Sequence, residues 1–117
     1  LPILLEVNVS GEASKHGWLA GDERRFQALI PEIEKIMQLQ HVRVRGLMSM
    51  APITQKPDEA RPYFARTRAL RDELQSRLPQ GDWSQLSMGM SEDFEAAVLE
   101  GATLVRIGTA ILGPRPA

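Results

Sequence analysis

Two short glycine-containing segments hold the residue types that bind a phosphate group. The first is Ser-Met-Gly-Met-Ser at 87–91, and the second is Arg-Ile-Gly-Thr-Ala at 106–110. Each supplies a hydroxyl group, a glycine at which the backbone can approach a ligand, and backbone N–H groups. The first also leads into a predicted helix, whose N-terminus favours an anion. The residues predicted to converge on one phosphate, or on a sulfate in its place, are Ser87, Met88, Gly89, Gly108 and Thr109.

A simpler interpretation of the two segments stays open. Gly89 and Gly108 are also ordinary turn residues, and serines commonly cap helices. Spacing alone does not separate the two interpretations, because loops that contain glycine and serine are frequent.

Arg106 favours a ligand near the second segment. It interrupts the apolar stretch Thr-Leu-Val-Arg-Ile at 103–107, and burial of an unpartnered guanidinium is unfavourable. Two explanations remain, an ion pair with a glutamate across the sheet and contact with a polar ligand. Asn8, within Val-Asn-Val-Ser at 7–10, presents the same choice.

The pattern of apolar residues predicts four strands that alternate with three helices. β-rich apolar runs indicate the strands, and helical spacing with proline or acidic residues near the first turn indicates the helices. The predicted strands are 3–9, 42–48, 84–87 and 103–107, and the predicted helices are 22–37, 57–78 and 91–98, the last capped by Ser91. This alternation predicts an α/β fold with parallel strands and right-handed helical crossovers, in a single unit covering 1–117. Ligands of such folds bind beyond the carboxyl ends of the strands, where both glycine-containing segments lie.

The composition excludes several classes of protein. Of 117 residues, 43% are hydrophobic and 25% charged, and there is no cysteine, which excludes a disulfide framework and a cysteine nucleophile. The net charge of -1 argues against a nucleic-acid partner, and no apolar run approaches the ~20 residues of a membrane span. Two isolated histidines predict no metal site. We therefore expect a cytoplasmic protein with no nucleic-acid or membrane partner, whose N-terminus at Leu1 is not the natural start.

Four motifs, in order along the chain, resemble those of one known family. They are Val-Asn-Val-Ser-Gly-Glu at 7–12 followed by Lys15 and Gly17, Arg-Gly-Leu-Met-Ser-Met at 45–50, Ser-Met-Gly-Met-Ser-Glu-Asp at 87–93, and Val-Arg-Ile-Gly-Thr-Ala-Ile-Leu-Gly at 105–113. They are similar to the motifs of the pyridoxal 5′-phosphate homeostasis protein family, whose fold is similar to the N-terminal barrel of alanine racemase.

The resemblance implies a (β/α)8 TIM barrel that binds pyridoxal 5′-phosphate (PLP) as a Schiff base to a lysine on an early strand. Ser87, Met88, Gly89, Gly108 and Thr109 match the family's phosphate-binding motifs. Arg106 matches the arginine that approaches the pyridine nitrogen. Such an arginine keeps this nitrogen unprotonated, which makes the ring a poorer electron sink than a carboxylate partner would.

The resemblance also implies that this chain is the C-terminal half of the barrel. A complete barrel takes roughly 200–250 residues, and about four of its eight strands would lie here. The three lysines are Lys15, in a polar loop, Lys35, on a helix beside two glutamates, and Lys56, before a proline. None lies within an apolar strand, so we expect the Schiff-base lysine to lie outside the chain and this piece to hold only the phosphate-binding half of the site.

Two functions from different classes follow. The first is a non-enzymatic PLP-binding protein of intracellular vitamin B6 homeostasis. The second is a fragment of a fold-type III PLP enzyme, such as an amino-acid racemase. The Ser-Met-Gly-Met-Ser segment favours the first, and a generic phosphate-binding α/β domain is a third alternative. Because half a barrel leaves strand edges unpaired, we also expect self-association or pairing with the N-terminal half.

Overall fold

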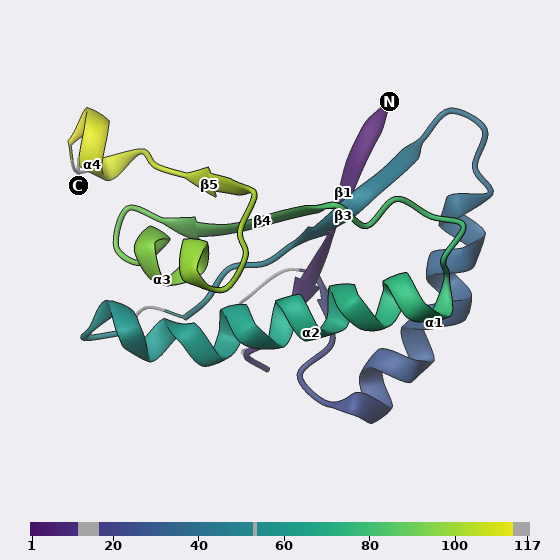
Figure 1. The fold of residues 1–117 in the computed structure, drawn as a ribbon, viewed down its shortest axis with the longest axis horizontal. Helices are drawn as coiled ribbons and strands as arrows, with labels where there is room; N and C mark the ends of the chain where they lie inside the picture. The colour runs from purple at the N-terminus through teal and green to yellow at the C-terminus, as the bar shows by residue number, and fades with distance from the viewer. Residues whose placement is uncertain (12–16, 53, 114–117) are drawn as a thin grey trace.

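The computed structural model of the chain describes residues 1–11, 17–52 and 54–113. Strands and helices alternate along most of this length (Figure 1). The strands are β1 (Pro2–Asn8), β2 (Trp18–Leu19), β3 (Arg43–Met48), β4 (Gln85–Met90) and β5 (Leu104–Arg106). The helices are α1 (Glu23–Met37), the 3-10 turn η1 (Pro57–Ala60), α2 (Arg61–Arg77), α3 (Phe94–Leu99) and α4 (Thr109–Leu112).

The strands form one parallel sheet in the order β2-β1-β3-β4-β5. This confirms the predicted α/β class with helical crossovers. The four longer strands follow one another across the sheet in chain order, as in one part of a (β/α)8 barrel. The sequence did not predict β2, whose two residues pair with Val7 and Asn8. β2 and β5 are therefore the two edges of this sheet.

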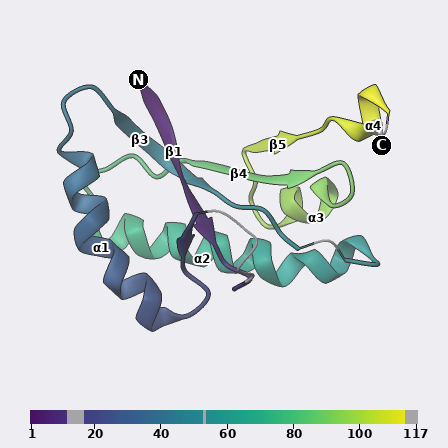
Figure 2. The same cartoon turned by 180° about the vertical axis from the view of Figure 1, so that it is seen from behind.

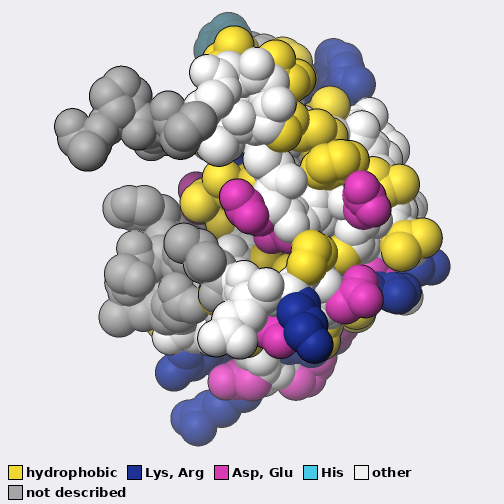
Figure 3. Space-filling view, turned by 90° about the vertical axis from the view of Figure 1, so that its left-hand side faces the viewer, with side chains coloured by type: hydrophobic (Ala, Val, Ile, Leu, Met, Phe, Trp, Pro, Cys, Tyr) yellow, Lys and Arg dark blue, Asp and Glu magenta, His cyan; other side chains and the backbone are white. Residues whose placement is uncertain are grey.

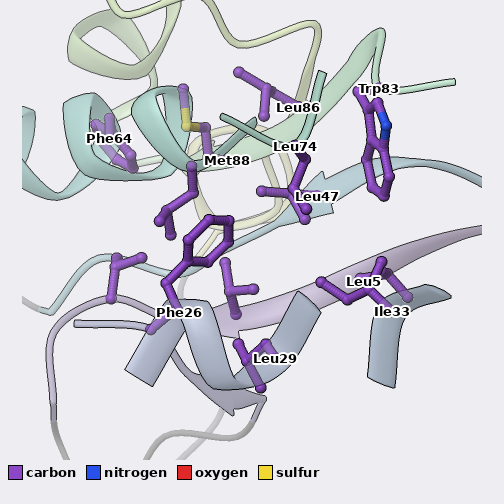
Figure 4. Close-up of a cluster of buried hydrophobic side chains, with 14 of the residues drawn as sticks. Leu5, Phe26, Leu29, Ile33, Leu47, Phe64, Leu74, Trp83, Leu86 and Met88 are labelled. Carbon is purple, nitrogen blue, oxygen red and sulfur yellow. The ribbon is translucent and has the colours of Figure 1, made fainter. Parts of the chain in front are cut away.

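One hydrophobic core lies between the sheet and its helices (Figure 4). Alternate residues of the strands point into it, including Leu5 and Val7 of β1 and Leu86 and Met88 of β4. Helix side chains cover them, with Phe26 from α1 and further residues from α2, all fully buried; the largest from α2 are Phe64, Leu70 and Leu74. Burial of each such side chain contributes roughly 1.5–3 kcal/mol. Figure 2 shows from behind how α1 and α2 run along the sheet.

The ends of the helices depend on capping groups that the sequence revealed only in part. Asp22 caps α1 as predicted, since its Oδ1 accepts a hydrogen bond from the Arg25 N–H at 2.8 Å. Gly101 follows α3 with φ +100°, the left-handed conformation expected after a helix. The predicted cap at Ser91 is wrong. α3 begins only after Asp93, whose Oδ1 accepts from the Met90 N–H at 2.7 Å.

Candidate functional site

An open groove with a volume of about 820 Å³ lies at the carboxyl ends of β4 and β5. Its lining includes Met50, Met90, Ser91, Arg106, Gly108 and Thr109. Figure 3 looks onto the end of the molecule where α4 lies. The groove therefore has the position at which parallel α/β folds bind their ligands, and three of the predicted site residues line it.

Ser91 joins the two loops that border the groove. Its Oγ accepts a hydrogen bond from the backbone N–H of Ala110 at 2.9 Å. Ser91 follows β4 and Ala110 lies in α4, so this bond holds the segment after β4 against the segment after β5. The hydroxyl that the sequence assigned to a helix cap instead fixes the shape of the groove.

Ser87 and Met88 do not lie in the loop that the sequence predicted. β4 continues to Met90, so both residues are inside the strand. The Met88 side chain is fully buried in the core, near Phe64 and Leu86 (Figure 4). Ser87 is 6% exposed, and its carbonyl oxygen accepts from the Ser49 N–H at 3.0 Å. Neither residue is among those that line the groove. The strand is longer than expected because its apolar face continues through Met88.

The two glycines of the predicted site serve different purposes. Gly89 has φ +104°, and a Cβ there would lie 2.7 Å from the Ala97 Cβ, so only glycine lets α3 pack on β4. Gly108 has no heavy atom within 4 Å of such a Cβ. Its carbonyl accepts hydrogen bonds from the first turn of α4. The packing of α3 on β4 therefore explains Gly89. At Gly108, the absence of a side chain leaves the backbone open to the groove.

Arg106 is held at the groove by one backbone hydrogen bond. Its Nη2 donates to the carbonyl oxygen of Ser49 at 2.8 Å. Among the residues that the structure describes, it forms no ion pair, which argues against a glutamate partner across the sheet. Its Nε is buried and has no hydrogen-bond partner in the described part of the chain. An unpaired donor of this kind fits a ligand with an acceptor atom.

Asn8 shapes the loop that follows β1. It is 3% exposed, and its Oδ1 accepts from the N–H groups of Ser10 and Gly11 at 3.2 and 3.0 Å and from the Ser10 hydroxyl. This turn is typical of asparagine after a strand. Asn8 does not line the groove. Glu12 and Lys15, which belong to the same family motif, lie outside the described residues.

Ser49 and Met50 belong to the motif at 45–50 that resembles the family, but sequence reasoning did not include them among the predicted site residues. Ser49 lies 57 residues before Arg106, and no local pattern marks its carbonyl group as a partner. Within the described ranges, no group of three acidic or histidine residues could hold a metal ion. No helix there is long and apolar enough to span a membrane.

The chain matches the family model "Alanine racemase, N-terminal domain" over residues 1–116. It belongs to this family. A curated relative named pyridoxal phosphate homeostasis protein, from Aquifex aeolicus, is 45% identical over an aligned length of 117 residues, and the alignment covers 97% of this chain and 46% of the relative. The protein of the same name from Escherichia coli K12 is 37% identical, over 98% of this chain and 46% of the relative.

Two solved structures of PipY from Synechococcus elongatus have the same fold. The structure without PLP has a TM-score of 0.82 and 38% sequence identity. The structure with PLP bound has a TM-score of 0.78 and 37% identity. Both comparisons cover 96% of this chain and 49% of PipY. The chain thus spans about half the length of the relatives and structures that it matches.

Proposed function

We propose that this chain is the C-terminal half of a PLP-binding protein of cytoplasmic vitamin B6 homeostasis. In this proposal residues 1–117 act as one unit that holds the phosphate and the pyridine nitrogen of the cofactor. The homologues named for PLP homeostasis and the PLP-bound structure of PipY support this assignment over an amino-acid racemase fragment.

The observation that carries the proposal is the buried Nε of Arg106 beside the groove, without a partner among the described residues. A buried N–H without an acceptor is unfavourable, and a deprotonated ring nitrogen is a suitable acceptor. The Thr109 hydroxyl and the backbone of Gly108 line the same groove and are suited to a phosphate. The residues present therefore fit both polar ends of PLP.

The proposed site still includes four further residues, each with a smaller role than the sequence predicted: Ser87, Met88, Gly89 and Asn8. Met88 is fully buried, so any contact with the ligand uses its backbone. Ser87 and Gly89 lie in β4, the strand that leads into the loop at the groove. Asn8 sets the path of the loop after β1.

When bound, PLP would supply a ring that withdraws electrons from an amine attached to it. The guanidinium of Arg106 is permanently charged and donates hydrogen bonds only, so it stabilises the unprotonated form of the ring nitrogen and weakens this electron-withdrawing power. That effect favours a carrier or regulator over an efficient enzyme. Ser91 maintains the groove by joining the two loops.

The lysine that holds PLP covalently lies, in this proposal, outside the chain. Lys35 and Lys56 are exposed, the first on α1 and the second before η1. A nucleophilic lysine needs desolvation or a neighbouring cation, and an exposed ammonium is not desolvated. We propose that the relatives' other half, as a second chain or segment, completes the site, or that two copies of this chain associate.

Titration with two probes tests the proposal. PLP and inorganic phosphate are added to the chain, and affinities are measured by calorimetry. Thr109→Ala is expected to weaken the binding of both probes about tenfold, since a hydrogen bond to a charged group is lost. Arg106→Gln is expected to weaken PLP binding and to leave phosphate binding unchanged.

Ser76→Ala, on an exposed part of α2, is the matched control for loss of a hydroxyl and is expected to change neither affinity. Equal PLP affinity in the Thr109→Ala, Arg106→Gln and Ser76→Ala chains would overturn the proposal.

A further inference from the structure

The Arg106 guanidinium forms a partly buried hydrogen bond with a residue outside both glycine-containing segments. The acceptor of its Nη2 is the carbonyl oxygen of Ser49, which directly follows β3. Ser49 is 1% exposed. Its own N–H donates to the carbonyl oxygen of Ser87 in β4 at 3.0 Å. One residue thus connects β3, β4 and β5 just below the groove.

The Ser49 side chain is in turn anchored to α2. The hydroxyl oxygens of Ser49 and Thr67 lie 2.8 Å apart, and Thr67 is fully buried. The Thr67 Oγ1 also lies 3.0 Å from the carbonyl oxygen of Tyr63, one helical turn earlier.

The number of available hydrogens determines which hydroxyl donates in the contact between Ser49 and Thr67. A hydroxyl group has one hydrogen to donate and two lone pairs that accept. The Tyr63 carbonyl can only accept, so Thr67 donates its proton to Tyr63 and accepts one from the Ser49 hydroxyl. The chain of contacts therefore runs from Ser49 to Thr67 to Tyr63, with every donor used.

We infer that Ser49, anchored by Thr67, is a positioning residue for the Arg106 guanidinium. Because Nη2 is bound to a carbonyl fixed from α2 and β4, rotation of the guanidinium is restricted and Nε keeps one direction. The affinity for a ligand that accepts a hydrogen bond from Arg106 then depends on α2, although α2 does not line the groove. The ligand in this inference rests on the proposed function, whereas the positioning of Arg106 rests on the observed contacts.

The first test needs no ligand. The Nε–H signal of Arg106 is recorded by 15N NMR in the ligand-free chain and is assigned from its absence in Arg106→Gln. Thr67→Val removes the hydroxyl and keeps a similar volume. It is expected to accelerate the exchange of this proton with solvent about tenfold, because one buried hydrogen bond is lost. Ser49→Ala leaves the Thr67–Tyr63 bond intact and is expected to have a similar effect, so it replaces Thr67→Val if that variant does not fold.

Two control variants separate positioning from general loss of stability. Leu70→Val removes one buried methylene from the same helix, where Leu70 is 1% exposed, without touching the hydroxyl contact. Thr67→Ser keeps the hydroxyl. Both are expected to leave the exchange of the Arg106 proton unchanged. Equal acceleration in Thr67→Val and Leu70→Val, or none in Thr67→Val and Ser49→Ala, would overturn the inference.

Ligand titration forms the second test. Thr67→Val is expected to weaken PLP binding roughly threefold to tenfold, to leave inorganic phosphate binding unchanged, and to have no further effect in an Arg106→Gln background. An equal further loss in that background would contradict positioning. If the unaltered chain binds neither probe, the proposed function fails, while the exchange measurement still decides the role of Ser49.

Discussion

Arg106 and Ser49 are separated by 57 residues, yet the Arg106 Nη2 donates to the Ser49 carbonyl oxygen at 2.8 Å. The bond crosses from β5 to the end of β3, over the intervening strand β4. It uses one guanidinium nitrogen and leaves Nε buried at the groove without a partner among the described residues. The same arginine therefore belongs both to the packing of the sheet and to the candidate ligand site.

Gly89→Ala is expected to destabilise the fold. The new Cβ would lie 2.7 Å from the Ala97 Cβ, and φ at this position is +104°. Steric overlap and a left-handed backbone together predict a loss of about 1–3 kcal/mol in the free energy of unfolding. Urea denaturation measures it.

Gly108→Ala is the control for that experiment, since a Cβ added there would have no heavy atom within 4 Å and φ is -115°. Its free energy of unfolding is expected to change little. Equal losses in the two variants would show that the packing of α3 on β4 does not require glycine.

Asp82 is expected to titrate at unusually low pH. Hydrogen bonds from the side chain and the backbone N–H of Ser84, followed by the charges of Arg45 and Arg43, lower the pKa of Asp82 below its ordinary value of 3.8. Ser84→Ala removes the first of these and is expected to raise the pKa. Carboxyl NMR signals followed against pH measure the change.

The sign of the associated stability follows from the lowered pKa. Ionised Asp82 is favoured in the folded chain, so its contribution is present above the unfolded-state pKa and is lost as the pH falls through the folded-state pKa. Ser84→Ala is expected to reduce acid stability in that range only. A pKa of Asp82 unchanged by Ser84→Ala would contradict the assigned cause.

PLP is expected to leave no covalent label on a particular lysine of this chain. Lys35 and Lys56 are exposed, and Lys15 lies outside the described residues. Borohydride treatment in the presence of PLP, followed by mass spectrometry of peptides, makes the measurement. Stoichiometric reduction onto one residue, for instance Lys15, would place the covalent site within the chain.

The chain is expected to associate at micromolar concentration. β5 is an edge strand with Leu104 48% exposed, and Ile111 and Leu112 of α4 are 73% and 85% exposed. Figure 3 shows hydrophobic side chains at the surface of this end of the molecule. Unpaired backbone groups beside exposed apolar side chains favour strand pairing with another chain.

Sedimentation measures the association, and Leu104→Lys is expected to shift it toward the monomer. Leu39→Lys alters an exposed leucine after α1, away from β5, and is expected to have no effect. A compact species of 13.0 kDa that unfolds cooperatively in the unaltered chain would contradict the prediction.

The sequence alone determined the alternation of strands and helices. Apolar spacing and local capping act over a few residues, so Asp22, Gly101 and the four longer strands could be recognised from the order of residues. The same local signals placed Gly108 and Thr109 after a strand, at the edge where the groove lies. The composition of these segments also carried the family resemblance.

Only the tertiary structure decided which polar groups meet. Ser91 looked like a helix cap from its neighbours in sequence, but its hydroxyl binds Ala110, 19 residues later. Met88 looked like part of a loop, but burial against α2 extends β4 past it. The Ser49 carbonyl is chemically identical to every other backbone carbonyl, and its role arises solely because parallel strands place it beside Arg106. Local patterns encode secondary structure, whereas contacts between distant residues depend on how the whole sheet is assembled.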